Sequence, residues 1–253
     1  MNENPKVSII TITYNAEKVL ERTIFSILNQ TYKNIEYIII DGASNDGTLI
    51  IVEKYKNDID IIISEPDNGL YDAMNKGLKA ANGEYVWFMN AGDEIFDENT
   101  TEEIFKNLDA DIYYGNALFV NNNGEHEGLR DIITPHLLPE NLSWKDFRFG
   151  MVVCHQAFIA RKSIVPLYDL NHPFSADIDW EINCLKKAKQ IENTHLVICK
   201  YLTGGFSKKN LIKSLKDRYV ILKKHFGTFS VFVDHGYIFI RSVKFSIKSL
   251  IQK

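Results

Sequence analysis

The chain of 253 residues is long enough for one large α/β domain, alone or with a modest appendage. Hydrophobic residues make up 45% and charged residues 25%, as in an ordinary globular protein, and the net charge of −4 argues against recognition of nucleic acid through bulk charge. Three scattered cysteines, Cys154, Cys184 and Cys199, exclude a disulfide framework or a zinc site, so we expect buried, reduced thiols.

The charge is unevenly distributed along the chain. Residues 208–253 contain 11 Lys or Arg and 2 Asp or Glu, a net charge of +9, which leaves 18 basic and 31 acidic residues, a net charge of −13, for residues 1–207. An acidic body with a basic tail predicts an anionic partner for the tail. The polar N-terminus indicates no signal peptide, and no apolar stretch reaches the ~18–20 residues that a helix needs to cross a bilayer. We therefore expect a cytoplasmic protein.

Strand and helix patterns alternate through the first half of the chain. Short runs rich in β-branched residues predict strands, and apolar residues at helical spacing predict helices. In chain order, the predicted elements are a strand at 7–13, a helix from Asn15 to Gln30, a strand at 35–41, a helix at 48–56, a strand at 59–64, a helix at 70–81, a strand at 85–89, a helix at 98–108 and a strand at 111–114. This alternation predicts a mostly parallel sheet that is covered by helices on both faces.

The pattern changes after about residue 115. Residues 116–150 show few clean periods, which predicts loops and an edge strand. Helical spacing returns at 177–189, and two helices at about 211–226 and 229–252 close the chain.

Polar residues follow four of the predicted strands: Tyr14-Asn15, Asp41, Asp67-Asn68 and Asn90 to Asp93. In open α/β sheets, ligands bind in the crevice beyond the carboxyl ends of the strands. The sequence therefore predicts a binding site at this edge.

Asp93 is the candidate metal ligand at this edge, with Glu94 or Asn90 as second choices. A carboxylate there could hold a divalent cation that neutralises a departing diphosphate. The same residues would also suit a polar turn before the next helix, and the motif alone leaves both interpretations open.

Several linked segments carry a resemblance to a known family: Thr11 to Asn15, Ile40 to Thr48, Asn75 to Gly77, Ala81 to Tyr85, Phe88 to Asp93, Val153 to Ala157, Ser175 to Asp177 and Gly204 to Ser207. In order and spacing they resemble the family 2 inverting glycosyltransferases with the GT-A fold. Tyr71 to Gly77 is similar to the branch that builds exopolysaccharide and surface glycans. The resemblance implies transfer of a sugar from a nucleotide-sugar donor, expected to be UDP-linked, to a glycan or lipid-linked acceptor with inversion, using Mn²⁺ or Mg²⁺.

The resemblance also implies roles for single residues. It places Thr13, Tyr14, Asn15 and Asp41 at the nucleotide base and ribose, Asp67 and Asn75 along the nucleotide and sugar pocket, and Asp93 at the last carboxylate of the metal motif. A carboxylate such as Asp41 can accept from a ring N–H or from ribose hydroxyls. Asn90 and Gly92 stand where the motif has its first acidic residues, so we expect weak metal affinity until the nucleotide supplies phosphate oxygens.

An inverting transfer needs a base that deprotonates the acceptor hydroxyl. Asp177, in the segment Ser175 to Glu181, matches the family's base, and Asp179 is the reserve. The alternative for Asp177 is a cap at the start of a helix, where a carboxylate is favoured anyway. His155 either touches the acceptor or a phosphate, or is a packed residue. Gly204 to Ser207 is either a loop over the donor or a plain turn.

We expect two regions: a catalytic domain at 1–207, with a nucleotide-binding half at about 1–115 and an acceptor half at about 116–207, and a basic amphipathic helical tail at 208–253. The tail would either bind the anionic inner face of the membrane or pack on the catalytic domain.

Two other function classes stay open. A nucleotidyltransferase usually has a glycine-rich basic loop after the first strand, where this chain has Tyr14 to Glu17 without glycine. A non-catalytic module that binds nucleotide sugars would keep Asp41 but need no base.

Overall fold

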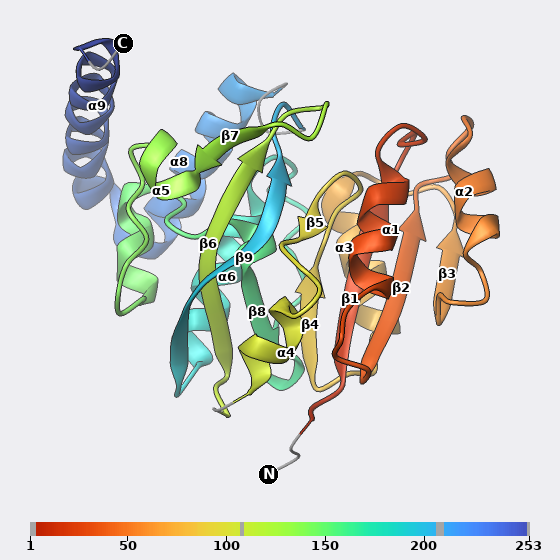
Figure 1. Ribbon diagram of the computed structural model, residues 1–253. Helices are drawn as coiled ribbons and strands as arrows, with labels where there is room; N and C mark the ends of the chain where they lie inside the picture. Colours follow the sequence, from red (N-terminus) through yellow and green to blue (C-terminus); the bar gives the residue numbers. More distant parts are fainter. Residues whose placement is uncertain (1–3, 107–108, 206–209, 252–253) are drawn as a thin grey trace.

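The computed structural model describes residues 4–106, 109–205 and 210–251 (Figure 1). Its N-terminal half contains four parallel strands, β1 (Val7–Thr13), β2 (Ile35–Asp41), β3 (Ile61–Ser64) and β4 (Tyr85–Phe88), joined through α1 (Leu20–Leu28), α2 (Thr48–Lys54) and α3 (Leu70–Ala80). All seven residues of β1 are buried, as expected for a strand that neighbours cover on both faces. These elements follow the predicted order.

In this half, the boundary that moves furthest is the start of the first helix. The helix expected from Asn15 begins at Leu20, because Asn15 has a φ of 49° and the N–H groups of Val19 and Leu20 both donate to the Ala16 carbonyl in a turn. Residues 14–19 therefore form a loop above the end of β1.

The second half adds strands that the sequence pattern did not indicate. Its elements are β5 (Glu94–Ile95), α4 (Thr100–Phe105), β6 (Ile112–Val120), β7 (His126–Leu129), α5 (Arg130–Ile133), the 3₁₀ helices η1 (Trp144–Phe149), η2 (His155–Ala157) and η3 (Lys162–Ile164), β8 (Phe158–Arg161), α6 (Ala176–Lys187), β9 (Ile191–Leu202), α8 (Leu211–Phe226) and α9 (Thr228–Ile251). The strand order is β3-β2-β1-β4-β8-β6-β9-β5, with β7 paired to β6. Because β8 is antiparallel to β4 and β6, and β5 to β9, this half of the sheet is mixed rather than mostly parallel. The predicted α/β class with helices on both faces of the sheet is confirmed (Figure 1).

An aromatic cluster under the middle of the sheet joins the two halves. The rings of Tyr168 and Trp180 stack at 5.1 Å, and Phe88 stacks on His155 at 5.4 Å. Phe88 belongs to β4 and Trp180 to α6, so the cluster fixes the start of α6 relative to the parallel strands. Cys154, Cys184 and Cys199 are buried free thiols, as expected.

The two C-terminal helices pack on the domain through one side only. In α8, Ile221 and Leu222 are fully buried, and Phe226 stacks on Trp144 of η1 at 5.3 Å. In α9, Val231 is buried and Asp234 pairs with Arg148 at 2.9 Å. Further along, α9 stands at the margin of the molecule (Figure 1). Within the described ranges, every helix is too short or too polar to span a membrane.

Candidate functional site

Three loops meet beyond the carboxyl ends of β1, β2 and β3. A Cβ placed on Gly42, which follows β2, would lie 2.4 Å from Asp67 Oδ2 and 3.3 Å from the Tyr14 ring. Only glycine therefore lets the Tyr14 and Asp67 side chains approach the end of β2. The Tyr14 ring is 63% exposed and Asp67 is half-buried, so both face an open edge.

Asp41 organises this edge from below. It is fully buried, and its carboxylate accepts hydrogen bonds from Ser44 N at 3.0 Å, from Ser44 Oγ at 2.5 Å and from Ser64 Oγ at 2.7 Å. Asn15 completes the loop by accepting from Asn45 N at 3.0 Å. Asp41 thus connects the loops after β2 and β3, whereas Tyr14, Asn15 and Asp67 line the edge itself.

The other two residues that the sequence assigned to the nucleotide pocket are enclosed. Thr13 is buried, and its hydroxyl has no hydrogen-bond partner among the described residues. Asn75 uses both ends of its amide on the backbone of Tyr168, accepting from its N–H at 2.8 Å and donating to its carbonyl at 3.0 Å. In the described structure, Asn75 therefore anchors the loop before α6.

The predicted metal motif lies after β4. Asp93 is 4% exposed and accepts from Leu202 N of β9 at 2.8 Å, and burial raises the pKa of its carboxyl well above the ordinary range. Gly92 has a φ of 101°, and a Cβ there would lie 2.5 Å from Leu202 Cδ2, so the backbone excludes the acidic residue that the family motif has at this position. Glu94, a second choice, lies 3.8 Å from Lys200.

A divalent cation at this point would receive few ligands from the protein. The described residues contain no group of three or more His, Cys, Asp or Glu placed to hold a metal. Asn90 Oδ1 is, however, buried without a hydrogen-bond partner among them, three residues from Asp93. One carboxylate and one amide oxygen suit a cation that takes its remaining ligands from a diphosphate and water, which is how Mg²⁺ is commonly bound.

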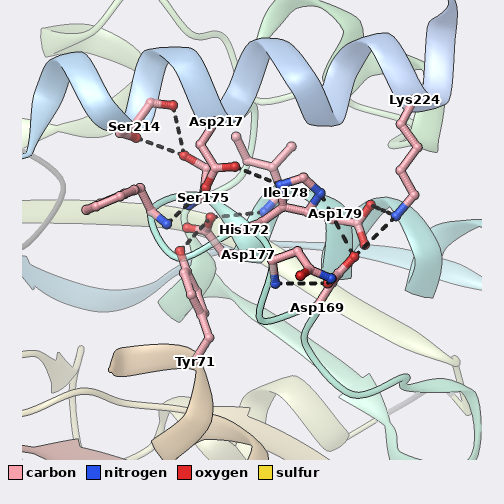
Figure 2. Close-up of polar contacts among 12 residues, drawn as sticks. Tyr71, Asp169, His172, Ser175, Asp177, Ile178, Asp179, Ser214, Asp217 and Lys224 are labelled. Carbon is pink, nitrogen blue, oxygen red and sulfur yellow. Dashed lines mark hydrogen bonds and ion pairs between the residues drawn. The ribbon is translucent and has the colours of Figure 1, made fainter. Parts of the chain in front are cut away.

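Asp177 lies at the start of α6 and points toward α3 (Figure 2). Its Oδ1 accepts from Tyr71 OH at 3.1 Å and from Ile178 N at 3.0 Å. No described residue donates a hydrogen bond to Oδ2. Asp177 is half-buried, so this oxygen remains free to take a proton from a bound molecule.

Asp179 is placed differently. It is 5% exposed, and its carboxylate accepts from Lys224 Nζ at 3.1 Å, from His225 Nε2 at 2.7 Å and from Asn183 Nδ2 at 2.9 Å. Burial raises the pKa of Asp179, but the hydrogen bonds from His225 and Lys224 outweigh it, so the pKa lies below its ordinary value. Oδ1 thus holds α8 against α6, and Oδ2 is occupied by Asn183 of the same helix.

The sequence pattern did not indicate that α8 contributes to this site. Asp217 accepts from the backbone N–H groups of Phe174 at 2.9 Å and Ser175 at 3.1 Å, and it contacts His172 Nδ1 at 2.7 Å (Figure 2). Ser214 Oγ lies 2.8 Å from Ser175 Oγ. Asp217 and Asp234 are the only acidic residues in the basic tail. Their position among basic residues was the one feature of the sequence that could have indicated that their side chains face the protein.

His155 is a packed residue. Its Nδ1 lies 3.0 Å from Glu181 Oε1, and its Nε2 lies 2.9 Å from Tyr168 OH. Burial lowers the pKa of His155 to about 4 and raises that of Glu181 well above its usual range, so the pair is neutral. The Glu181 carboxyl then donates to Nδ1, and the N–H of Nε2 donates to Tyr168.

Comparison with known proteins gives the family. The sequence model of Glycosyl transferase family 2 matches residues 8–165, more than half of the chain. The PGL/p-HBAD biosynthesis glycosyltransferase of Mycobacterium bovis (strain BCG / Pasteur 1173P2) is 29% identical over 226 residues, which cover 85% of this chain and 84% of the relative. The chain therefore belongs to glycosyltransferase family 2.

Solved structures agree on the fold. S. aureus TarS 1–349 in complex with UDP has a TM-score of 0.65 at 21% identity, covering 86% of this chain and 65% of that one. Mannosyltransferase PcManGT from Pyrobaculum calidifontis, in complex with GDP-Man and Mn²⁺, has a TM-score of 0.56 at 17% identity, covering 85% and 63%. The chain has the GT-A fold of these proteins and spans less than two thirds of the length of either.

Proposed function

We propose that this protein transfers a sugar from a nucleoside-diphosphate sugar, expected to be UDP-linked, to a hydroxyl of a surface glycan or its lipid-linked precursor, with inversion at the anomeric carbon. Family membership and the similarity to TarS, which was solved with UDP, support the donor class. The relative named for PGL/p-HBAD biosynthesis supports a role in the assembly of cell-surface glycans.

The hydrogen bond from Tyr71 to Asp177 carries this proposal. The two residues are 106 positions apart and join α3 to α6 at 3.1 Å. Tyr71 holds Oδ1 in place, and the helix N-terminus stabilises the negative charge. The free Oδ2 would accept the proton of the acceptor hydroxyl as that oxygen attacks the sugar from the face opposite the departing diphosphate.

Asp93 and Asn90 would hold the divalent cation, Mn²⁺ or Mg²⁺, together with the diphosphate. When bound, such a cation acts as a Lewis acid on the leaving group. Tyr14, Asn15 and Asp67 would contact the nucleotide, while Asp41 shapes the loop from beneath. Thr13 and Asn75 would act indirectly, by positioning the backbone of this edge.

We further propose that α8 and α9 attach the enzyme to an anionic membrane surface. Both acidic residues of the tail are turned inward, Asp217 to His172 and Asp234 to Arg148. The outward side combines basic residues with large exposed apolar side chains, namely Ile212, Leu215, Val220, Phe229, Phe232, Val233, Ile240, Val243 and Ile247. An amphipathic helix of this kind binds at the interface between lipid headgroups and acyl chains.

The activity is tested by a screen of nucleotide sugars. The purified protein should release free sugar slowly from one donor in the presence of Mn²⁺, because water replaces the missing acceptor. It should bind the matching nucleoside diphosphate more tightly with the metal than with a chelator. Donor binding without hydrolysis or transfer would favour a non-catalytic binding module, and absence of donor binding would contradict the proposal.

A further inference from the structure

Three arginines gather around one backbone segment beside the proposed base. Arg130 of α5 donates to the carbonyl of Val152 at 2.7 Å and also to that of Met151. Arg241 of α9 donates to the carbonyl of Phe149 at 3.0 Å and contacts His136 Nδ1 at 3.1 Å. A Cβ on Gly150, between these carbonyls, would lie 3.7 Å from Arg218 Nη1 of α8. We call Arg130, Arg218 and Arg241 the arginine cluster.

The guanidinium groups of this cluster have no direct anionic partner in the described part of the protein. Among the described residues, no carboxylate forms an ion pair with any of the three guanidinium groups, whereas Arg148 and Arg161 both have carboxylate partners. The Nε atoms of Arg218 and Arg241 are buried and have no hydrogen-bond partner there. Burial of unpaired charge and of unpaired donors is unfavourable, so the arrangement indicates a missing anionic partner.

The electrostatics of the neighbouring groups agree. Burial lowers the pKa of all three arginines, and for Arg218 the charge of Asp177 opposes that shift. Burial, together with the three positive charges, lowers the pKa of His136 to about 3, so this imidazole is neutral and adds no positive charge. The nearby carboxylate that acts on Arg218 is thus the proposed base itself.

We propose that the arginine cluster binds the phosphate or pyrophosphate group of the acceptor and so presents the acceptor hydroxyl to Asp177. Guanidinium groups suit this role, because their paired N–H donors match phosphate oxygens. The cluster takes Arg130 from the catalytic domain and Arg218 and Arg241 from the proposed membrane-binding helices, and α5, α8 and α9 lie at one end of the molecule (Figure 1). This inference rests on the proposed function for the identity of the base, but the anion site can be tested without turnover.

The test measures binding of inorganic pyrophosphate by calorimetry to the full-length protein saturated with UDP. Pyrophosphate should bind the wild type, and Arg218→Gln and Arg241→Gln should each weaken it by about tenfold or more, as expected when a charged hydrogen bond is lost. Arg218→Lys should fall between, because it keeps the charge but not the paired donors. Lys216→Gln, an exposed charge removed from the same helix, is the matched control and should bind like the wild type.

A second arm separates the sources of the anion. The probe is a neutral phosphatidylcholine vesicle that contains a polyprenyl pyrophosphate. If the acceptor is lipid-linked, the wild type should bind these vesicles more tightly than it binds soluble pyrophosphate. If the acceptor is a soluble phosphorylated glycan, the two affinities should be equal. The proposal would be overturned if Arg218→Gln bound pyrophosphate as tightly as the wild type. It would also be overturned if Arg218→Gln lost affinity for UDP, because the cluster would then bind the donor. Pyrophosphate binding that depends on the cluster in a protein without donor hydrolysis would instead refute only the proposed function.

Discussion

The edge above β1 to β3 and the junction between α6 and α8 are both polar, but they are built in different ways. At the edge, the groups that meet come from loops directly after successive strands, as Tyr14, Gly42 and Asp67 do. At the junction, Asp177 and Asp179 share one turn of α6, yet their partners, Tyr71 and His225, come from opposite directions along the chain. The residues of the edge can therefore be assigned from their positions directly after the strands. At the junction, only the packing of α3 and α8 shows which of the two carboxylates is free and which one holds helices together.

The largest effect is expected when the two aspartates of α6 are replaced, one at a time, by asparagine. Asp177→Asn keeps the size of the side chain and an acceptor for Tyr71 but cannot take up a proton at neutral pH. Transfer should fall by ~10²-fold or more, in line with the loss of general base catalysis, with UDP affinity unchanged. Initial rates with acceptor and calorimetry with UDP measure the two effects.

Asp179→Asn is the matched control and should behave in the opposite way. It breaks contacts with Lys224 and His225, so the free energy of unfolding should fall on the order of 1–3 kcal/mol, whereas kcat should change little at temperatures where the variant is folded. A catalytic loss in Asp179→Asn alone would mean that the base stands two residues further along the helix.

The next largest effect is expected at the predicted metal motif, which follows β4. Asp93→Asn keeps an oxygen for Leu202 N and so preserves the fold, but it removes the carboxylate that would ionise on binding a cation. The gain in UDP affinity on adding Mn²⁺ should shrink by ~10-fold or more, as is typical even for losses in the outer shell of a metal. Binding of UDP in a chelator should stay equal to wild type. A full Mn²⁺ effect in the variant would remove Asp93 from the metal site.

The outward side of the tail can be tested without disturbing the junction. A chain cut near residue 207 would lose Asp217 and the buried Ile221 and Leu222, so surface substitutions are the cleaner choice. Phe229 and Phe232 are 83% and 76% exposed. Phe229→Ser with Phe232→Ser should reduce co-sedimentation with anionic vesicles several-fold, with unchanged thermal stability. Lys223→Gln with Lys244→Gln should weaken binding by ~1 kcal/mol per charge, and mainly at low salt. Equal binding to neutral and anionic vesicles would contradict the electrostatic part.

The last test concerns the buried His155–Glu181 pair beneath the junction, which affects stability and not the site itself. Between pH 4.5 and 6.5, the ordinary values of the two groups, the unfolded chain holds one proton on His155 and the native pair holds one on Glu181, so the pair gives no pH dependence. Above pH 6.5 only the native state keeps its proton, so this pair makes the free energy of unfolding fall by ~1.4 kcal/mol per pH unit until Glu181 ionises.

Glu181→Gln separates this contribution from the rest of the protein. Glutamine can still donate to His155 Nδ1, but the native state no longer carries the extra proton. Denaturant unfolding should show a weaker alkaline loss than in wild type and, because unfolded His155 still protonates, a new loss as the pH falls below 6.5. Parallel pH profiles for the two proteins would mean that the native pair is not neutral.

The sequence by itself determined the parallel half of the sheet and the loops at its edge. β1 and β2 have the predicted bounds because runs of β-branched residues between turn residues fix a buried strand locally. It also placed Asp177 and Asp179 in the first turn of a helix, since helical spacing is a local property too. It did not indicate β8 and β9, whose partners lie far along the chain and whose residues lack a clean alternation.

Tertiary structure alone decided which partners the site residues have. The assignment of Asp41 and Asn75 to the nucleotide stays a prediction, and their hydrogen bonds to Ser64 and Tyr168 also tie together the loops around the site. The arginine cluster combines Arg130 with Arg218 and Arg241, which lie 88 and 111 positions further along the chain, and its lack of ion pairs depends on where α8 and α9 dock. Whether a carboxylate or a guanidinium group is free follows from burial and from partners that long-range packing brings within about 3 Å, and neither is encoded in local periodicity.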